Sequence, residues 1–229
     1  MARSKLERFA EVSSFPHVYE FDFRELDSGF KLKGNWNKEH FKNDQPIVLE
    51  LGCGKGEYTV GLAKKYPGKN FIGVDIKGNR IWRGAKTALD EHIANAAFLR
   101  TRIDFIDSCF SMGEVSEIWI TFPDPQPQKS RIRKRLTSPV FLARYKKILS
   151  PGGRIRLKTD SQELWNYSLE VVREFGHTLI CSSPDLYADP SGDFEDAASI
   201  ETYYESKFKK LGFTICYLEF KLMPPAAKT

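Results

Sequence analysis

Residues 47–56, IVLELGCGKG, restrict the possible folds of this chain more than any other segment. An apolar run that ends in glycines is typical of a buried parallel strand followed by a tight turn into a helix. Glycines adopt backbone angles that other residues avoid, and they let the backbone approach a ligand closely. Nucleotide-binding α/β sheets hold their ligands at the carboxyl ends of the strands. The segment therefore predicts an α/β fold with a ligand site directly after residue 51.

The rest of the chain continues this alternation of strands and helices. Strand-like segments are expected at 71–75, 97–101, 117–121, 154–159, 178–182 and 214–222. Helices are expected at about 58–66, 79–95, 139–149, 161–175 and 199–211. Such alternation indicates an α/β domain with a mostly parallel sheet. The last two strands have only the short last helix between them, which predicts an antiparallel C-terminal end.

The regular pattern begins at Pro46, so we interpret residues 46–229 as the main domain and residues 1–45 as an N-terminal arm. Aromatic residues are interleaved with charges in the arm, which favours an ordered segment that packs on the main domain. Its first residues, with Arg3, Lys5 and Arg8, are expected to be frayed.

The positive charge of the chain is concentrated in one place. The 229 residues hold 35 Lys and Arg against 30 Asp and Glu, a net charge of +5. Residues 129–135, KSRIRKR, carry five positive charges, so the remainder is about neutral. A local basic patch of this kind is typical of a contact with nucleic acid. The alternative is a solvated charged face, the usual fate of charge runs.

The cysteines and the hydropathy pattern point to a reduced, soluble protein. Four cysteines lie far apart, and neither they nor the four histidines show metal-ligand spacing. No apolar stretch resembles a signal peptide or a membrane span. We therefore expect a cytoplasmic protein with free thiols, no metal and no membrane partner. The pattern leaves open whether the protein is a monomer or a homodimer.

The glycine loop discriminates between cofactors. A phosphate-binding P-loop motif is absent, and Glu57 occupies the third glycine position of the dinucleotide fingerprint, where it would repel a pyrophosphate. The observed Gly52-x-Gly54-x-Gly56, preceded by Glu50, resembles motif I of the S-adenosylmethionine-dependent methyltransferases. That cofactor carries an ammonium and a sulfonium but no phosphate, so an acid beside the loop is favourable. The alternative is that the glycines form only a tight turn.

Acidic residues after the next two strands complete the expected cofactor site. Asp75 ends the second strand, where a carboxylate can accept hydrogen bonds from both ribose hydroxyls; alternatively it caps a helix. Ile103 could wall the adenine, and Asp104 could meet its edge. The alternative for Asp104 is an ordinary surface loop.

Asp124 is the candidate catalytic residue. It follows the fourth strand between Pro123 and Pro125, which fix the backbone on either side of the carboxylate. The basic run begins five residues later, so a carboxylate that reads a base would stand next to cations that hold phosphates. The alternative is a rigid surface turn with an incidental acid.

Three further motifs give a family resemblance. They are FPDPQPQKSRIRKRL at 122–136, Lys158-Thr159-Asp160 after the fifth strand, and Thr202-x-Tyr204-Glu205-x-x-Phe208 with Gly212 behind it. Together with motif I, these segments resemble the tRNA (guanine-N7-)-methyltransferase family over about residues 46–222. The resemblance implies the class I methyltransferase (Rossmann-like) fold. It also implies methyl transfer to N7 of a guanosine in the tRNA variable loop.

The resemblance also implies roles for single residues. Asp124 would hold the guanine and stabilise its developing charge, assisted by Asp160, while Thr202 and Glu205 would close over the base. The family usually has lysine where this chain has Gln128, a candidate substrate contact, and it usually has aspartate near Ile103. The candidate RNA contacts are Lys129, Arg131, Arg133, Lys134 and Arg135.

Two other functions remain open from the sequence. One is a methyltransferase of the same fold that acts on another RNA base or on a protein. Such enzymes often carry a Pro-Pro-aromatic turn where this chain has Pro-Asp-Pro. The other is a non-catalytic RNA-binding module, for which a degenerate glycine loop would be expected.

Overall fold

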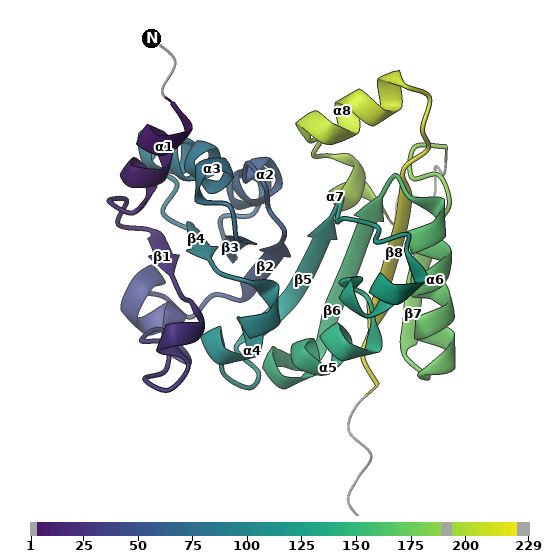
Figure 1. Cartoon of the computed structure of the whole chain (residues 1–229), viewed down its shortest axis with the longest axis horizontal. Coiled ribbons are helices and arrows are strands. Elements are labelled where there is room, and N and C mark those ends of the chain that lie inside the picture. Colours follow the sequence, from purple (N-terminus) through teal and green to yellow (C-terminus); the bar gives the residue numbers. More distant parts are fainter. Residues whose placement is uncertain (1–3, 189–193, 224–229) are drawn as a thin grey trace, which may run out of the picture.

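The centre of the molecule is a parallel sheet whose strands are buried on both faces. A computed structural model describes residues 4–188 and 194–223, and within them eight strands form one sheet in the order β1-β4-β3-β2-β5-β6-β8-β7 (Figure 1). The central parallel strands are β2 (Ile47–Leu51), β3 (Asn70–Asp75), β4 (Ala96–Arg100), β5 (Val115–Thr121) and β6 (Leu149–Thr159). All residues of β2 and β3 are buried, as the apolar runs in the sequence predict.

The C-terminal end of the sheet is antiparallel, which confirms the expectation from the sequence. The last two strands are β7 (Thr178–Ser183) and β8 (Cys216–Lys221). Strand β8 lies between β6 and β7 and runs antiparallel to both, with Thr159 paired to Cys216.

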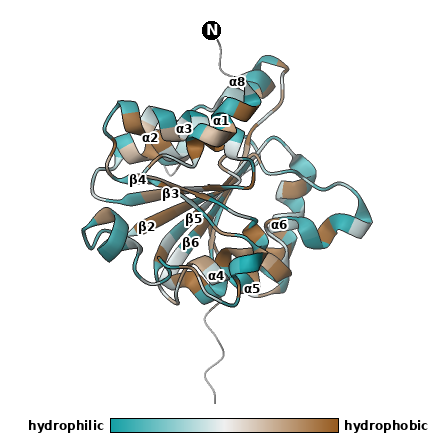
Figure 2. Cartoon of the chain, turned by 60° about the vertical axis from the view of Figure 1, so that its left-hand side comes forward, coloured by the Kyte–Doolittle hydropathy of each residue, from teal (hydrophilic) through white to brown (hydrophobic). Residues whose placement is uncertain are grey.

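Helices cover both faces of the sheet (Figure 2). One face carries α1 (Lys5–Val12), α2 (Glu57–Lys65) and α3 (Gly78–Asp90). The other carries α4 (Ile106–Cys109), α5 (Pro139–Ile148) and α6 (Gln162–Glu174). Two more helices, α7 (Glu195–Ala198) and α8 (Tyr203–Lys210), lie near the carboxyl ends of β5 and β6 (Figure 1). None of the helices among the described residues is long and apolar enough to cross a membrane.

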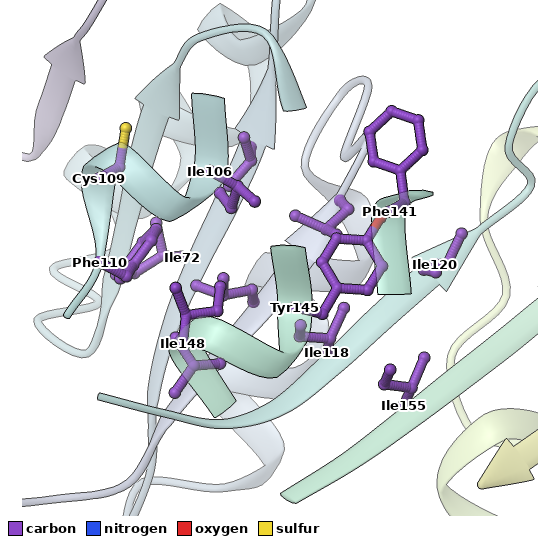
Figure 3. Close-up of a cluster of buried hydrophobic side chains, with 14 of the residues drawn as sticks. Ile72, Ile106, Cys109, Phe110, Ile118, Ile120, Phe141, Tyr145, Ile148 and Ile155 are labelled. Carbon is purple, nitrogen blue, oxygen red and sulfur yellow. The ribbon is translucent and has the colours of Figure 1, made fainter. Parts of the chain in front are cut away.

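Each face of the sheet has its own hydrophobic core. Under α4 and α5, Phe110, Tyr145 and Ile148 belong to one cluster of buried side chains with Ile118 and Ile155 of the sheet (Figure 3). These side chains are at most 1% exposed, so a change to alanine here would cost about 2–5 kcal/mol. The two cores hold the central strands, and with them the loops that follow, in fixed positions.

The arm contains structure that the sequence pattern did not predict. Strand β1 (Val18–Glu20) extends the sheet by pairing in parallel with β4. It has three residues, too few to show a period. The expectation of a frayed start is wrong for Lys5 and Arg8, because Ser4 and Glu7 form a reciprocal capping box at the start of α1; Arg3 lies outside the described residues. Trp36 is fully buried and donates from Nε1 to the carbonyl of Cys109 at 3.2 Å.

Candidate active site

The strand order places two loops side by side at the centre of the sheet. The order reverses between β2 and β5, and such a switch point leaves a crevice at the carboxyl edge. The glycine loop follows β2, and the Pro-Asp-Pro loop follows β5. Two adjoining cavities of about 330 and 470 Å³ open there. Both are lined by Gly52, Arg80, Phe122, Pro123 and Asp124.

The first half of the glycine loop faces these cavities. Gly52 and Gly54 have φ angles of 78° and 55°, in the left-handed region that favours glycine. The amides of Gly52 and Cys53 both donate to the carbonyl of Val74, at 2.8 and 3.0 Å. A Cβ atom on Gly52 would have no protein atom within 4 Å, although Gly52 lines both cavities. The loop therefore leaves space beside its backbone that a ligand can occupy.

Gly56 does not line either cavity, in contrast to its expected cofactor contact. A Cβ atom on Gly56 would lie 2.6 Å from Cε1 of Phe98 and 3.1 Å from the Cα of Gly84. Its φ angle is 70°. The third glycine of the motif is therefore required for close packing of α2 against α3 and β4.

Glu50 is buried at the base of the loop. Its Oε1 accepts from Thr121 Oγ1 at 2.6 Å, and its Oε2 accepts from the amide of Thr59 at 2.8 Å. Burial raises the pKa of Glu50 to about 7, against the opposing effect of these hydrogen bonds. Through these hydrogen bonds the Glu50 side chain joins β2, β5 and α2. Glu50 also lines the first cavity, where the expected ammonium of the cofactor would lie.

Asp75 lines the second cavity and also braces the loop. Its Oδ2 accepts from the amide of Gly54 at 2.9 Å, and its Oδ1 accepts from the amide of Lys77 at 2.8 Å. Each carboxylate oxygen can accept a further hydrogen bond, so the ribose contact expected for Asp75 is compatible with this geometry.

The second cavity suits the nucleoside part of S-adenosylmethionine. Its wall includes Ile103 and Asp104, as the adenine expectation requires, and Asp104 also pairs with Arg102 at 3.3 Å. Thr101 Oγ1 is buried at the same cavity without a hydrogen-bond partner among the described residues. A buried hydroxyl without a partner is costly, so a polar ligand group here would be favourable. The donors and acids of this wall therefore fit the expected cofactor.

The Pro-Asp-Pro loop presents Asp124 to both cavities. The carboxylate is exposed, and its Oδ1 accepts from the amide of Gln126 at 3.0 Å. Phe122 and Gln126 have φ angles of 47° and 45°, which are unusual for residues other than glycine. Backbone strain of this kind occurs where the surrounding structure holds a functional loop in place. The amide of Phe122 is fixed by a 2.8 Å bond to the carbonyl of Lys158.

The far wall of the first cavity comes from the C-terminal part of the chain. Asp160 and Thr202 line it, as expected for a substrate site. Burial raises the pKa of Asp160. Tyr204 and Phe208 line it as well, and the Phe208 ring lies 6.1 Å from that of Phe122. The sequence motif contained both aromatic residues without indicating that they face the cavity.

Glu205 lies outside both cavities, in contrast to its expected contact with the base. It is fully buried, and its Oε2 accepts from Lys158 Nζ at 2.8 Å. Its Oε1 accepts from the Tyr187 hydroxyl at 2.6 Å. The carboxylate also caps α8 through the amide of Thr202. In this arrangement Glu205 holds the start of α8, and its oxygens do not face the cavity.

The basic run forms a 3-10 helix, Lys129–Lys134, beside the Pro-Asp-Pro loop. All cations of the basic run are exposed except Arg135, which directly follows this helix. Among the candidate RNA and substrate contacts, the exposed ones are Gln128, Lys129, Arg131, Arg133 and Lys134, of which Lys134 lines the second cavity. This placement is compatible with phosphate contacts for the four exposed cations. Gln128 lines neither cavity.

The expectation that Arg135 contacts RNA is wrong for this structure. The residue is 3% exposed, and its guanidinium pairs with Glu163 and donates to the carbonyl of Gln126 at 3.2 Å. The amino-acid sequence of a basic segment does not show which of its cations points into the protein. The described residues hold no group of three or more His, Cys, Asp and Glu side chains that could bind a metal ion.

The chain is similar to known methyltransferases over most of its length. Residues 44–218 match the family model described as "Putative methyltransferase". The chain is 49% identical to a tRNA (guanine-N(7)-)-methyltransferase of Christiangramia forsetii, across 96% of this chain and 99% of the relative. It is 51% identical to a tRNA (guanine-N(7)-)-methyltransferase of Porphyromonas gingivalis, across 93% and 88% of the two chains.

Solved structures share the fold at low sequence identity. One of them is a variant of the 16S rRNA (adenine(1408)-N(1))-methyltransferase of Catenulisporales acidiphilia with the cosubstrate SAM. It aligns with a TM-score of 0.56 and 14% identity, across 86% of this chain and 93% of that chain. At this identity the similarity establishes the class I methyltransferase fold and nothing finer.

Proposed function

The chain belongs to the tRNA (guanine-N(7)-)-methyltransferase family, and from this premise we propose that it transfers the methyl group of S-adenosylmethionine to N7 of a guanosine in tRNA. The guanosine would lie in the variable loop, and the reaction would take place in the cytoplasm. In this proposal residues 46–229 form the methyltransferase domain, and residues 1–45 form an arm that packs on it.

The observation that carries the proposal is the position of Asp124 between the two cavities. The second cavity is bounded by Gly52, Asp75 and Ile103, and the first lies between the rest of the glycine loop on one side and Asp160 with the start of α8 on the other. A cofactor that extends from the second cavity along the glycine loop would therefore meet a base held near Asp160 and α8 beside this carboxylate.

The residues that would hold the cofactor follow from these walls. Glu50 and the glycine loop would hold the methionine part, Asp75 the ribose, and Ile103 the adenine. When bound, S-adenosylmethionine supplies a methyl group activated by a sulfonium. The protein contributes alignment, because correct orientation of two reactants removes much of the entropic barrier.

The acceptor needs no general base. N7 of guanine has a lone pair and no proton, so it can act as the nucleophile without being deprotonated. The aromatic rings of Phe122, Tyr204 and Phe208 offer stacking surfaces for an extruded base. Transfer leaves a positive charge on the imidazole ring of the base, and the Asp124 carboxylate would stabilise that charge as it develops. Exposed cations of the 3-10 helix would hold the phosphates.

The direct test uses unmodified tRNA with tritiated S-adenosylmethionine, followed by nucleoside analysis. We expect label in 7-methylguanosine. Asp124→Asn keeps the shape and removes the charge, so the single-turnover rate should fall by about 100-fold. Binding of tRNA to this variant should change little because phosphates dominate affinity. Label in another nucleoside would contradict the proposed acceptor. A normal single-turnover rate would contradict the role of Asp124.

A further inference from the structure

Arg135 is the buried cation of the basic run, and its partners lie inside the protein. It is 3% exposed, whereas Arg131 and Arg133 are exposed. Its guanidinium carbon lies 4.5 Å from the ring centre of Tyr167, and Nη2 pairs with Glu163. A phosphate could reach this guanidinium only by displacing these partners. The residue therefore has a role inside the protein.

One part of that role concerns the loop that carries Asp124. Nε and Nη2 of Arg135 both donate to the carbonyl oxygen of Gln126, at 3.3 and 3.2 Å. The amide of Gln126 donates in turn to Oδ1 of Asp124 at 3.0 Å. The φ angle of Gln126 is 45°, a conformation that costs free energy and needs support from its surroundings. Arg135 supplies that support, and two hydrogen bonds through Gln126 connect it to the Asp124 carboxylate.

The other part concerns the opposite wall of the cavity. Glu163 and Tyr167, which hold the guanidinium, belong to α6. The N-cap of α6 is Ser161, whose side chain accepts from the amide of Leu164. Asp160, which lines the first cavity, is the residue directly before this cap. The guanidinium thus spans from the loop of Asp124 to the helix that follows Asp160.

We propose that Arg135 is a positioning residue that fixes Asp124 relative to Asp160 for methyl transfer. This inference rests on the proposed function, because it concerns the orientation of the acceptor base. Arginine suits the task since its planar fork can donate to two acceptors and stack on a ring simultaneously. A lysine would keep the charge but lose that geometry. A displacement of about 1 Å in such a site can lower a rate by about 100-fold.

The first experiment separates positioning from phosphate binding. Arg135→Lys should lower the turnover at saturating tRNA by about 10-fold to 100-fold. Its salt dependence of tRNA binding should equal that of the wild type. Arg133→Ala, an exposed neighbour, should instead reduce the log–log salt slope by about 0.7–0.9. The proposal is overturned if Arg135→Lys turns over within about twofold of the wild type. It is also overturned if the salt slope falls as in Arg133→Ala.

The second experiment changes the partner of Arg135. Glu163→Gln keeps the shape but weakens the hold on the guanidinium, and Glu170→Gln on the exposed side of α6 is the matched control for charge. If Arg135 positions the loop, Glu163→Gln should turn over several-fold more slowly than Glu170→Gln, with equal tRNA affinity. If Arg135 contacts phosphate, Glu163→Gln should bind tRNA more tightly than the control and keep its turnover. That second result overturns the proposal.

Two measurements keep the outcomes distinct. Thermal unfolding and binding of S-adenosylhomocysteine report whether Arg135→Lys keeps its fold and its cofactor site. If the variant loses either, the comparison of Glu163→Gln with Glu170→Gln tests the positioning role instead. Wild-type protein that forms no 7-methylguanosine would refute the proposed function itself. Wild-type activity with no difference between Glu163→Gln and Glu170→Gln would refute only the positioning role.

Discussion

On the cofactor side of the cleft, a backbone carbonyl and an acidic side chain of the neighbouring strand hold the loop, whereas on the acceptor side the side chains of buried cations hold the loops. The glycine loop is fixed by the carbonyl of Val74 and the carboxylate of Asp75, both on the neighbouring strand. Loops of the acceptor side are fixed by the side chains of Arg135 and Lys158, which donate to the backbone carbonyls of Gln126 and Ala197.

Lys158 shows how such a cation organises its surroundings. Its side chain is fully buried on β6, and Nζ donates to the carbonyls of Ala197 and Ile200, at 2.6 and 3.1 Å, as well as to Glu205. These three acceptors satisfy the three donors of an ammonium group. Burial lowers the pKa of Lys158, and the charge of Glu205 opposes this shift. One side chain thereby anchors the α7–α8 segment over the cavity.

The comparison teaches that the two sides differ in what a substitution breaks. The hydrogen bonds to the Val74 carbonyl survive most side-chain changes, so the cofactor side should be sensitive chiefly where Asp75 is lost or where a side chain intrudes. A buried cation leaves an uncompensated partner when it is lost, so the acceptor side should be sensitive to single charge removals. Three measurements test this difference.

The largest effect is expected for Lys158→Met. The change leaves the Glu205 carboxylate buried without its cation, so the free energy of unfolding should fall by about 3–5 kcal/mol. Lys158→Met combined with Glu205→Leu should recover part of this loss, since no charge is then stranded. Urea unfolding of the single and double variants measures both values.

The control for this prediction is another lysine of the same region. Lys209 pairs with Glu201 at 2.8 Å on the surface, and Lys209→Met should cost at most about 1 kcal/mol. The distinction between buried and surface lysines would be contradicted if Lys158→Met and Lys209→Met lost equal free energies of unfolding. It would also be contradicted if the loss in the double variant at Lys158 and Glu205 equalled the sum of the single losses.

An intermediate effect is expected within the glycine loop itself. Gly54 and Gly56 both have positive φ angles, so an alanine is strained at either position. Gly56→Ala must also displace Phe98, which adds about 1–3 kcal/mol of overpacking. Gly54→Ala places its methyl group beside the cavity and should chiefly weaken the binding of S-adenosylhomocysteine. Thermal unfolding and calorimetric titration of both variants separate packing from binding. The assignment of Gly56 to packing and Gly54 to cofactor binding fails if Gly54→Ala is the less stable variant. It also fails if Gly54→Ala binds S-adenosylhomocysteine as tightly as the wild type.

The smallest effect is a pH dependence at Glu50. Burial raises the pKa of this carboxyl to about 7, so the folded state holds the proton longer than the unfolded state does. The contribution of Glu50 to stability is therefore greatest at low pH and falls as the pH rises through 7. The ionised form attracts the ammonium of the ligand, so the affinity for S-adenosylhomocysteine should rise by up to about tenfold from pH 6 to pH 8.

Glu50→Gln provides the control for the pH dependence. It cannot titrate, so its affinity should vary less over the same interval than that of the wild type. Identical pH profiles for the wild type and Glu50→Gln would show that another group is responsible.

The cofactor side of the cleft and the mostly parallel character of the sheet could be predicted from the sequence. The apolar run before Gly52, the acid at Glu50 and the strand that ends at Asp75 all lie within 30 residues of one another, and the structure brings them to the expected edge. The antiparallel end of the sheet was predicted as well, because only one short helix was expected between the last two strands.

Only the tertiary structure decided which charged residues serve the interior. The sequence presents Arg133 and Arg135 as equivalent members of one basic run, yet one is exposed and the other is buried. Glu205 belongs to a motif that implies substrate contact, yet its oxygens bind Lys158 and Tyr187. Local patterns encode the conformation of the backbone, which depends on near neighbours. The partner of a long charged side chain depends on which distant segment the packed core brings within about 3 Å, and no local pattern contains that information.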